Sequence, residues 1–215
     1  MKFINSFFLY AGFILIFINT VLFLIGYKQN KKAIAYKFFT VYLMISFVIS
    51  IAAFILAKQH IPNLYLSHAY FIGQFVLLSF FYWSLFNLKQ KPYVLITMML
   101  VIVLLAIQYA LKPHLIDMFN LFEIFVTSLP LVVYAIVHLY NSLNKSNNYL
   151  IINAGILIYI TSSTLIFILG NFLSNADMSD AVRNIYMINK ILYVVYLTLI
   201  LIQWKTSFRP INSKL

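Results

Sequence analysis

The sequence predicts an all-α membrane protein, a polytopic bundle of seven transmembrane helices in one domain that covers residues 1–215. Of the 215 residues, 64% are hydrophobic and only 9% are charged, whereas soluble domains carry about 25% charged residues. The apolar residues also come in runs of about 20, the length that crosses a hydrocarbon core about 30 Å thick. Together these two observations exclude a water-soluble domain.

Seven apolar segments are the predicted spans, and short polar connections join them. The spans are Phe3–Tyr27, Ala33–Ala57, Tyr70–Leu88, Tyr93–Leu111, Met118–Tyr140, Tyr149–Leu173 and Ile185–Trp204. The first is expected to be a retained helix, because its apolar stretch is longer than a signal-peptide core and no small-residue cleavage site follows. No connection is long enough for a separate soluble domain.

The distribution of lysine and arginine predicts the orientation. One side of the predicted bundle collects basic residues and no acid: Lys28, Lys31, Lys32, Lys37, Lys89, Lys91, Lys145, Lys205, Arg209 and Lys214. The other side has Lys2, Lys58, Lys112 and Arg183 together with Asp117, Asp177 and Asp180. Because basic loops stay in the cytoplasm, the N-terminus is expected outside and the C-terminus in the cytoplasm. Residue usage rich in Lys, Ile and Asn is typical of AT-rich bacterial genomes, so the expected location is the bacterial inner membrane.

The net charge of +11 does not indicate a nucleic-acid partner. The basic residues are scattered among short loops instead of forming a binding stripe, and there they meet anionic lipid headgroups. Membrane lipids are therefore the expected partners. The absence of cysteine excludes disulfides and thiol chemistry.

Two charged residues within the predicted spans, Glu123 and Lys190, form the first candidate site. A retinal Schiff base on Lys190 is disfavoured, because the third span has no acidic counterion and Lys190 lies near the outer end of its helix. Glu123 and Lys190 lie five residues into their spans from the same side, and buried charges favour an oppositely charged partner. The sequence therefore predicts an intramembrane ion pair or a shared outer vestibule. Separate snorkelling of the two side chains stays open.

Histidines in the predicted outer loops form a second candidate. His60, His68 and His114 lie there near Asp117, and histidine with carboxylate suits zinc. Their spacing matches no metal motif, and loops ordinarily carry polar residues. No metal or other cofactor is therefore expected.

The third candidate is a stripe of small and polar residues along the sixth span: Gly155, Tyr159, Ser162, Ser163 and Gly170. Small residues let helices approach closely in lipid, and hydroxyls can hydrogen-bond across the contact. The stripe is expected to be a helix-packing face, with a ligand-lining role as the alternative.

Enzymatic activity is not expected, and no catalytic residues are predicted. The seventh span lacks the histidines of seven-helix zinc hydrolases, and Ser162 and Ser163 have no mid-span histidine as a general base. An unrecognised intramembrane enzyme is the third hypothesis. A small-solute transporter is the second, because seven spans can form two three-helix repeats and a linker.

The segment INAGILIYITSSTLIFILGN at 152–171, followed by a polar loop and the last span, is similar to uncharacterised seven-span inner-membrane proteins of Bacteroidetes-type bacteria. Some of these resemble the membrane input modules of sensor kinases. The resemblance implies a sensor-like or accessory subunit. Because the sequence contains no catalytic domain, signalling is expected to pass through a separate membrane or cytoplasmic partner protein.

Overall fold

The structure is a computed structural model and describes residues 2–27, 33–143, 149–176 and 178–208. Its helices are α1 (Lys2–Tyr27), α2 (Ile34–Lys58), α3 (Tyr65–Leu85), α4 (Lys91–Leu111), η1 (Pro113–Asp117), α5 (Leu121–Ser142), α6 (Leu150–Asn175), α7 (Ser179–Gln203) and η2 (Trp204–Phe208). No strand occurs within these residues. The predicted all-α fold is confirmed.

The chain is a multi-pass helical membrane protein. Six of its seven long helices are long and apolar enough to cross a membrane. Many large apolar side chains on their outer surfaces are exposed, among them Phe7, Ile14, Val48 and Leu165, as expected where lipid replaces water. The remaining helix, α3, is not among the six, and His68, Gln74 and several serines and tyrosines interrupt its apolar residues.

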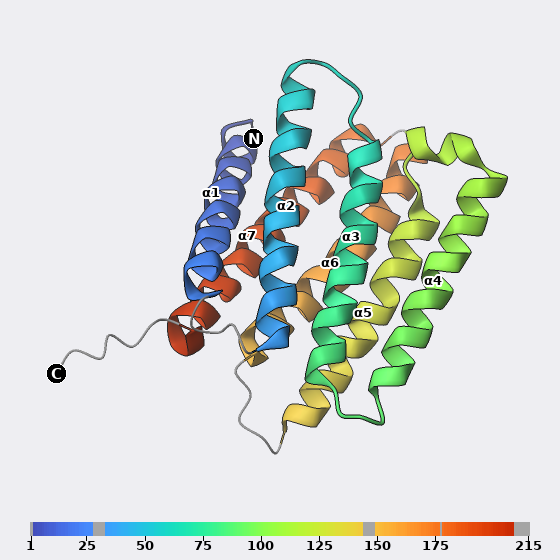
Figure 1. Ribbon diagram of the computed structural model, residues 1–215. Helices are drawn as coiled ribbons and strands as arrows, with labels where there is room; N and C mark the ends of the chain where they lie inside the picture. Colours follow the sequence, from blue (N-terminus) through green and yellow to red (C-terminus); the bar gives the residue numbers. More distant parts are fainter. Residues whose placement is uncertain (1, 28–32, 144–148, 177, 209–215) are drawn as a thin grey trace.

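Six helices form a ring in the order α1, α2, α3, α5, α6, α7, in which each packs against the next and α7 closes against α1. α4 lies outside the ring, against α3 and α5. Successive helices run in alternating directions, so the two ends of the bundle are distinct (Figure 1). The end where α1 begins is called the N-terminal end, and the end where α7 finishes is called the C-terminal end.

The core is most tightly packed in the half nearer the C-terminal end. Fully buried side chains from α1, α2, α3 and α7 fill the ring there: Phe23, Phe39, Leu43, Leu78, Phe81 and Ile200. Side-chain hydrogen bonds to backbone carbonyls tie α1 into this half, from Asn19 to Leu197 (2.8 Å) and from Tyr36 to Phe23 (2.9 Å). In lipid such bonds count because no water satisfies the polar groups.

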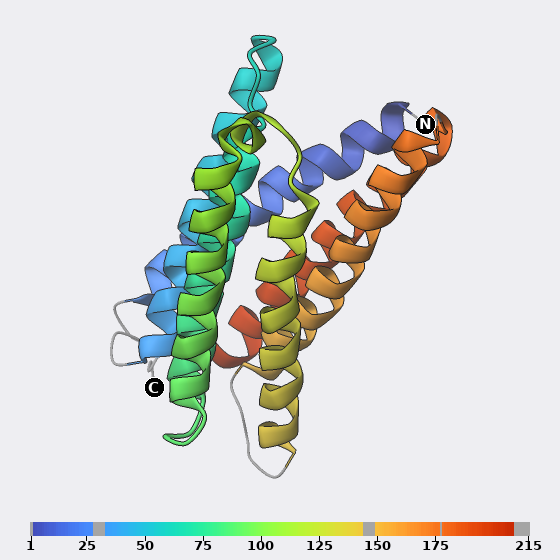
Figure 2. The same cartoon turned by 90° about the vertical axis from the view of Figure 1, so that its right-hand side faces the viewer.

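Toward the N-terminal end, α1 and α2 diverge (Figure 2). In this half α1 follows α7 and leans away from α2, and its side chains at Phe7, Tyr10 and Ile14 are about half exposed. The divergence leaves a wedge between α1, α2 and α7, and the candidate site lies in it.

Two helix starts lie five or six residues ahead of the sequence-based boundaries. α3 begins at Tyr65 instead of Tyr70, and the Ser67 hydroxyl in its first turn donates to the Leu64 carbonyl (2.6 Å). α7 begins at Ser179 instead of Ile185. Asp180 in its first turn favours the helix N-terminus and pairs with Arg183 at 2.8 Å.

Candidate functional site: a cavity beside Lys190

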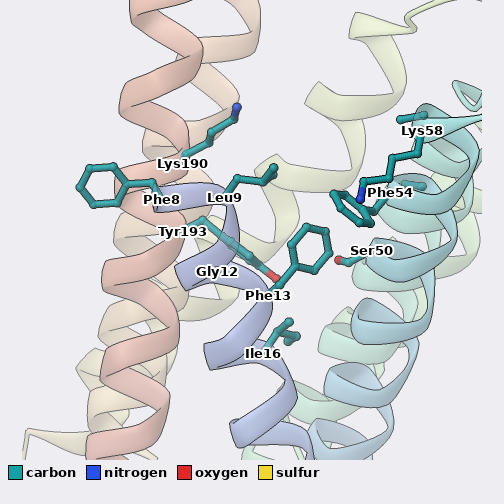
Figure 3. A pocket seen from close by; sticks show the side chains of 12 residues that line it. Phe8, Leu9, Gly12, Phe13, Ile16, Ser50, Phe54, Lys58, Lys190 and Tyr193 are labelled. Atoms are coloured by element: carbon teal, nitrogen blue, oxygen red, sulfur yellow. The ribbon is translucent and has the colours of Figure 1, made fainter. Parts of the chain in front are cut away.

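A cavity of about 530 Å³ lies in the wedge between α1, α2 and α7. The cavity is elongated along α1, where its lining residues run from Phe8 to Ile16, a rise of about 12 Å. Most of the wall is apolar. The α1 backbone passes close to Tyr193 at Gly12, where an added Cβ would lie 3.3 Å from the Tyr193 ring. Figure 3 shows the cavity between the three helices, with Lys190 near its upper end and Ile16 at its lower end.

Two lysines supply the cavity's charge. Lys190 projects from α7, and its Nζ donates to Asn5 Oδ1 on α1 at 2.6 Å. Lys58, at the end of α2, holds its Nζ 4.7 Å from the centre of the Phe54 ring. Within the described part of the chain, neither ammonium has a carboxylate within ion-pairing distance. The cavity is therefore apolar and cationic, and no acidic residue lines it.

Aromatic side chains stand across the gap between α1 and α2. The rings of Phe13 and Phe54 meet edge to face with centroids 5.1 Å apart, and Tyr10 approaches Phe54 at 6.4 Å. Such contacts contribute about 0.5–1.5 kcal/mol beyond burial. They separate the cavity from the lipid-facing surface by side chains alone.

A second cavity of about 370 Å³ lies on the other side of Lys190, between α2, α3, α6 and α7. The two cavities share four lining residues: Ser50, Ala53, Lys190 and Tyr193. The second is the more polar of the two, with side chains of Asn63, Ser67, Tyr70 and Asn189 in its wall. The Oδ1 atom of Asn189 is buried and accepts no hydrogen bond from the described residues.

Hydrogen-bonded tyrosines form the floor of this second cavity. Gln74 donates to the hydroxyls of Tyr42 (3.2 Å) and Tyr70 (3.3 Å), and Tyr196 donates to Tyr42 (3.3 Å). Tyr159 stacks on Tyr196 with ring centroids 5.1 Å apart. Below this layer begins the tightly packed half of the bundle, so both cavities are on the N-terminal side of a closed core.

A separate polar cluster lies where α3, α4 and α5 meet near the N-terminal end. Glu123 is fully buried, and both of its carboxylate oxygens lie 3.1 Å from His68 Nδ1. Tyr109 of α4 donates a hydrogen bond to the same carboxylate. Asn120 caps α5 by accepting from the Glu123 backbone N–H (3.2 Å). Every polar group of this cluster has a partner inside the protein.

The hydrogen bonds limit where the protons of this cluster can lie. His68 Nε2 is 3.1 Å from the Ile116 carbonyl, which only accepts, so Nε2 must carry a proton. The contact between Nδ1 and Glu123 then needs one further proton, held by the imidazole or by the carboxyl group. The pair has the same net charge, zero, in both arrangements, which makes burial of Glu123 tolerable.

The predicted ion pair between Glu123 and Lys190 is wrong. Glu123 bonds to His68 and Tyr109, whereas Lys190 bonds to Asn5. The physical reason is the order of the ring, in which α6 separates α5 from α7. The earlier start of α7 also places Lys190 about 16 Å from the first residue of its helix, farther along the helix than the sequence-based boundary implied. Only Lys190 lines the cavities, so the two residues do not share a vestibule.

The histidines do not come together. His68 was placed in a loop from the sequence, but the earlier start of α3 puts it in that helix, buried against Glu123. His60 is exposed between α2 and α3, and His114 and Asp117 are exposed in η1. Among the described residues, no group of three or more His, Cys, Asp or Glu side chains could hold a metal ion.

The stripe on α6 divides into packing and lining residues. Gly155 and Gly170 face α7, where an added Cβ would lie 3.1 Å from Tyr196 and 2.9 Å from Tyr186 respectively. Tyr159 lines the second cavity. Ser163 is buried and Ser162 half buried. The two ends of the stripe thus hold α6 against α7, and Tyr159 between them faces the second cavity.

Several site residues escaped the sequence analysis. Asn120 followed by Glu123 three positions later is a capping-box pattern, and it would have placed Glu123 in the first turn of its helix. Asn5 and Tyr193 carry no comparable local signal, because only the ring arrangement brings α1 and α7 together around Lys190.

The fold and the site define a multi-pass helical membrane protein with a cationic, mainly apolar cavity near one end. Comparisons with family models, with curated proteins and with solved structures find no match to this chain.

Proposed function

We propose that the protein is a non-enzymatic, sensor-like subunit of the bacterial inner membrane that binds a ligand in the cavity beside Lys190 and signals through a separate partner protein. In this proposal all seven helices cross the membrane, the N-terminal end of the bundle faces outward, and the lysine-rich C-terminal end faces the cytoplasm.

The observation that carries the proposal is the one-sided placement of the cavities. Both lie near the N-terminal end, and the buried tyrosine layer and packed aromatic core lie between them and the C-terminal end. A ligand-sized space of this kind, mostly apolar with a few convergent polar groups, is the usual form of a binding site. A receptor needs access from one side only, whereas a transporter needs access from both.

α7 supports a signalling role because it connects the cavity to the opposite end. Lys190 and Tyr193 line the cavities, and about three turns beyond Tyr193, Gln203 accepts hydrogen bonds from the backbone N–H of Ile151 (2.8 Å) and Ile152 (3.4 Å). η2 continues α7, and its Phe208 packs on Tyr149 with centroids 5.1 Å apart. A shift of α7 at the cavity would therefore reach the C-terminal end, where Lys89, Lys91 and Lys205 offer a basic surface to an acidic partner.

Single-cysteine labelling tests the proposal, and the chain has no native cysteine to interfere. Ser50→Cys, in the wall of both cavities, is expected to react with a membrane-impermeant thiol reagent in spheroplasts and not in inside-out vesicles. Ser179→Cys and Asn63→Cys, at the N-terminal end, are controls for outward accessibility, and Thr206→Cys, at the C-terminal end, is the control for inward accessibility. Reversed control labelling would overturn the orientation. Labelling of Ser50→Cys from both sides would support the transporter instead.

The signalling part of the proposal has its own measurement. The group attached at Ser50→Cys occupies the cavity, so hydrogen–deuterium exchange of residues 204–208 should change after modification. The same reagent on Ser179→Cys is the control. Unchanged exchange at 204–208 would argue against a sensor.

One buried feature favours the transporter as a second candidate. The His68–Glu123 pair is a proton-binding group inside a membrane bundle, and such residues mark proton relays in transporters. Its enclosure by Tyr109, Asn120 and the Ile116 carbonyl separates it from the cavities, which is why it ranks second.

A further inference from the structure

The strongest unassigned feature is the chemistry of the cavity wall between α1, α2 and α7. The wall carries the ammonium groups of Lys58 and Lys190, its other lining residues are mostly apolar, and no Asp or Glu lines it. A ligand that matches this wall needs an anionic group and an apolar body. We propose that the cavity binds a single-chain anionic amphiphile with a carboxylate headgroup, the chemical class of a free fatty acid. This inference rests on the proposed function and specifies its ligand.

The headgroup position follows from the unused donors of the two lysines. An ammonium has three N–H donors. Among the described residues, Lys190 donates one hydrogen bond, to Asn5 Oδ1, and the Lys58 ammonium lies over the Phe54 ring. A carboxylate beside either ammonium would accept charge-assisted hydrogen bonds, which are about twice as strong as neutral ones. The amide of Asn5 holds Lys190 toward α1, which is the side of the cavity.

The tail position follows from the rest of the wall. From the level of Lys190 the cavity continues past Leu9, Gly12 and Phe13 to Ile16 (Figure 3). Its length along α1 is about 12 Å, which suits one medium-length acyl chain. Burial of such a chain contributes about 0.8 kcal/mol for each CH₂ group. Beyond the two lysines, the hydroxyls of Ser50 and Tyr193 are the polar side-chain groups in this wall.

The route of access is lateral, from the outer leaflet. α1 and α2 diverge at this end, and the edge-to-face contact of Phe13 with Phe54 spans the gap. Among the described residues no backbone hydrogen bond joins α1 to α2, so a rotamer change of two aromatic rings would open the gap. An amphiphile dissolved in the membrane would enter tail-first, with its carboxylate kept at the level of the headgroups and the two lysines.

Photolabelling with a diazirine fatty acid tests the inference on the full-length protein in phosphatidylcholine nanodiscs. We expect crosslinks on the cavity wall of α1, α2 and α7, and we expect added decanoate to abolish them. Decylammonium, which has the same tail and the opposite charge, should not compete. The Lys58→Met/Lys190→Met double variant should need at least about tenfold more decanoate for competition.

Matched variants separate loss of the site from loss of the fold. Lys190→Arg keeps the cation and should retain labelling. Lys112→Met removes an exposed lysine near the same end that does not line the cavity, and it should leave competition unchanged. Equal competition by decylammonium, or unchanged competition in the double variant, would contradict the proposal that the ligand has a carboxylate headgroup.

The source of the ligand and the proposed function can be distinguished in the same system. If phosphatidylglycerol in the nanodisc displaces the probe as well as decanoate does, the occupant is a two-chain lipid and the proposal is wrong. Labelling spread evenly over exposed positions such as Phe7 and Ile14 would also contradict it. The thiol accessibility of Ser50→Cys does not depend on ligand charge, so it can support one-sided binding even where the carboxylate fails.

Discussion

Two corners near the N-terminal end of the bundle treat an intramembrane charge in opposite ways. At the α3–α4–α5 corner, Glu123 is fully buried and bonds to His68 and Tyr109. At the α1–α2–α7 corner, Lys190 is half buried and faces two cavities, and among the described residues its ammonium bonds to the neutral Asn5. The first charge is compensated within the protein. The second is left uncompensated beside empty space, which is the arrangement expected where a ligand supplies the missing charge.

The largest effect should come from breaking the compensated corner. His68→Leu and Glu123→Leu should each lower the free energy of unfolding by about 3–5 kcal/mol, since each leaves a buried polar partner unpaired. The His68→Leu/Glu123→Leu double variant should recover part of the loss. Thermal unfolding in a mild detergent gives the values. Additive losses would show that the two side chains do not act as a pair.

A smaller loss is expected from removing the third member of that corner. Tyr109→Phe deletes the hydroxyl that donates to Glu123 and keeps the ring, so stability should fall by about 1.5–3 kcal/mol. Tyr140→Phe, at a largely exposed position, is the matched control and should change little. Equal effects of the two substitutions would mean that the Tyr109 hydroxyl contributes nothing beyond its ring.

The seam that fixes α7, and with it Lys190, should tolerate little added volume. Gly155→Leu should lower stability by about 1–3 kcal/mol through overpacking against Tyr196 and Leu199. Gly155→Ala should be less stable than Gly73→Ala, because an added methyl at position 73 meets only Ile45, at 3.9 Å. The same unfolding measurement ranks all three variants. Gly155→Leu at wild-type stability would show that α6 and α7 are loosely packed.

The smallest effect tests whether the two corners are independent. Lys190→Met combined with Glu123→Gln should show a coupling free energy within about 0.5 kcal/mol of zero, because no residue bonds to both side chains. A double-mutant cycle on unfolding measures it. A coupling free energy well above that value would restore the direct pair that the sequence suggested.

The sequence predicted the architecture well because lipid imposes a simple rule on it. Each span must be long, apolar and internally hydrogen-bonded, so composition alone predicts a helical membrane bundle. The partners of Glu123 and Lys190 could not be predicted in the same way. Their partners depend on which helices are neighbours in the ring. The spacing of apolar residues along the sequence does not report the order of helices around a bundle.

The helix starts near His68 and Glu123 differ from the cavity beside Lys190 in how much the local sequence reports about them. The Asn120 side chain caps α5 at the Glu123 backbone, and α3 begins at Tyr65, three residues ahead of His68. These two helix starts bring His68 and Glu123 to one level of the bundle. The cavity beside Lys190 had no such signal, because it results from the divergence of α1 and α2, and neither helix contains proline.

The polarity of α3 has a consequence for how the protein is made. Three of its side chains find their partners on other helices: His68 on α5, Gln74 on α2 and Tyr82 on α6, where Asn153 accepts at 2.7 Å. The ribosome completes α3 before α5 and α6 exist. Because unpartnered polar groups are costly in the bilayer, α3 should settle in lipid less readily by itself than the six helices of higher hydropathy. Its integration should therefore depend on the downstream helices, so α3 should be less fully inserted in a chain truncated after α4 than in the full chain.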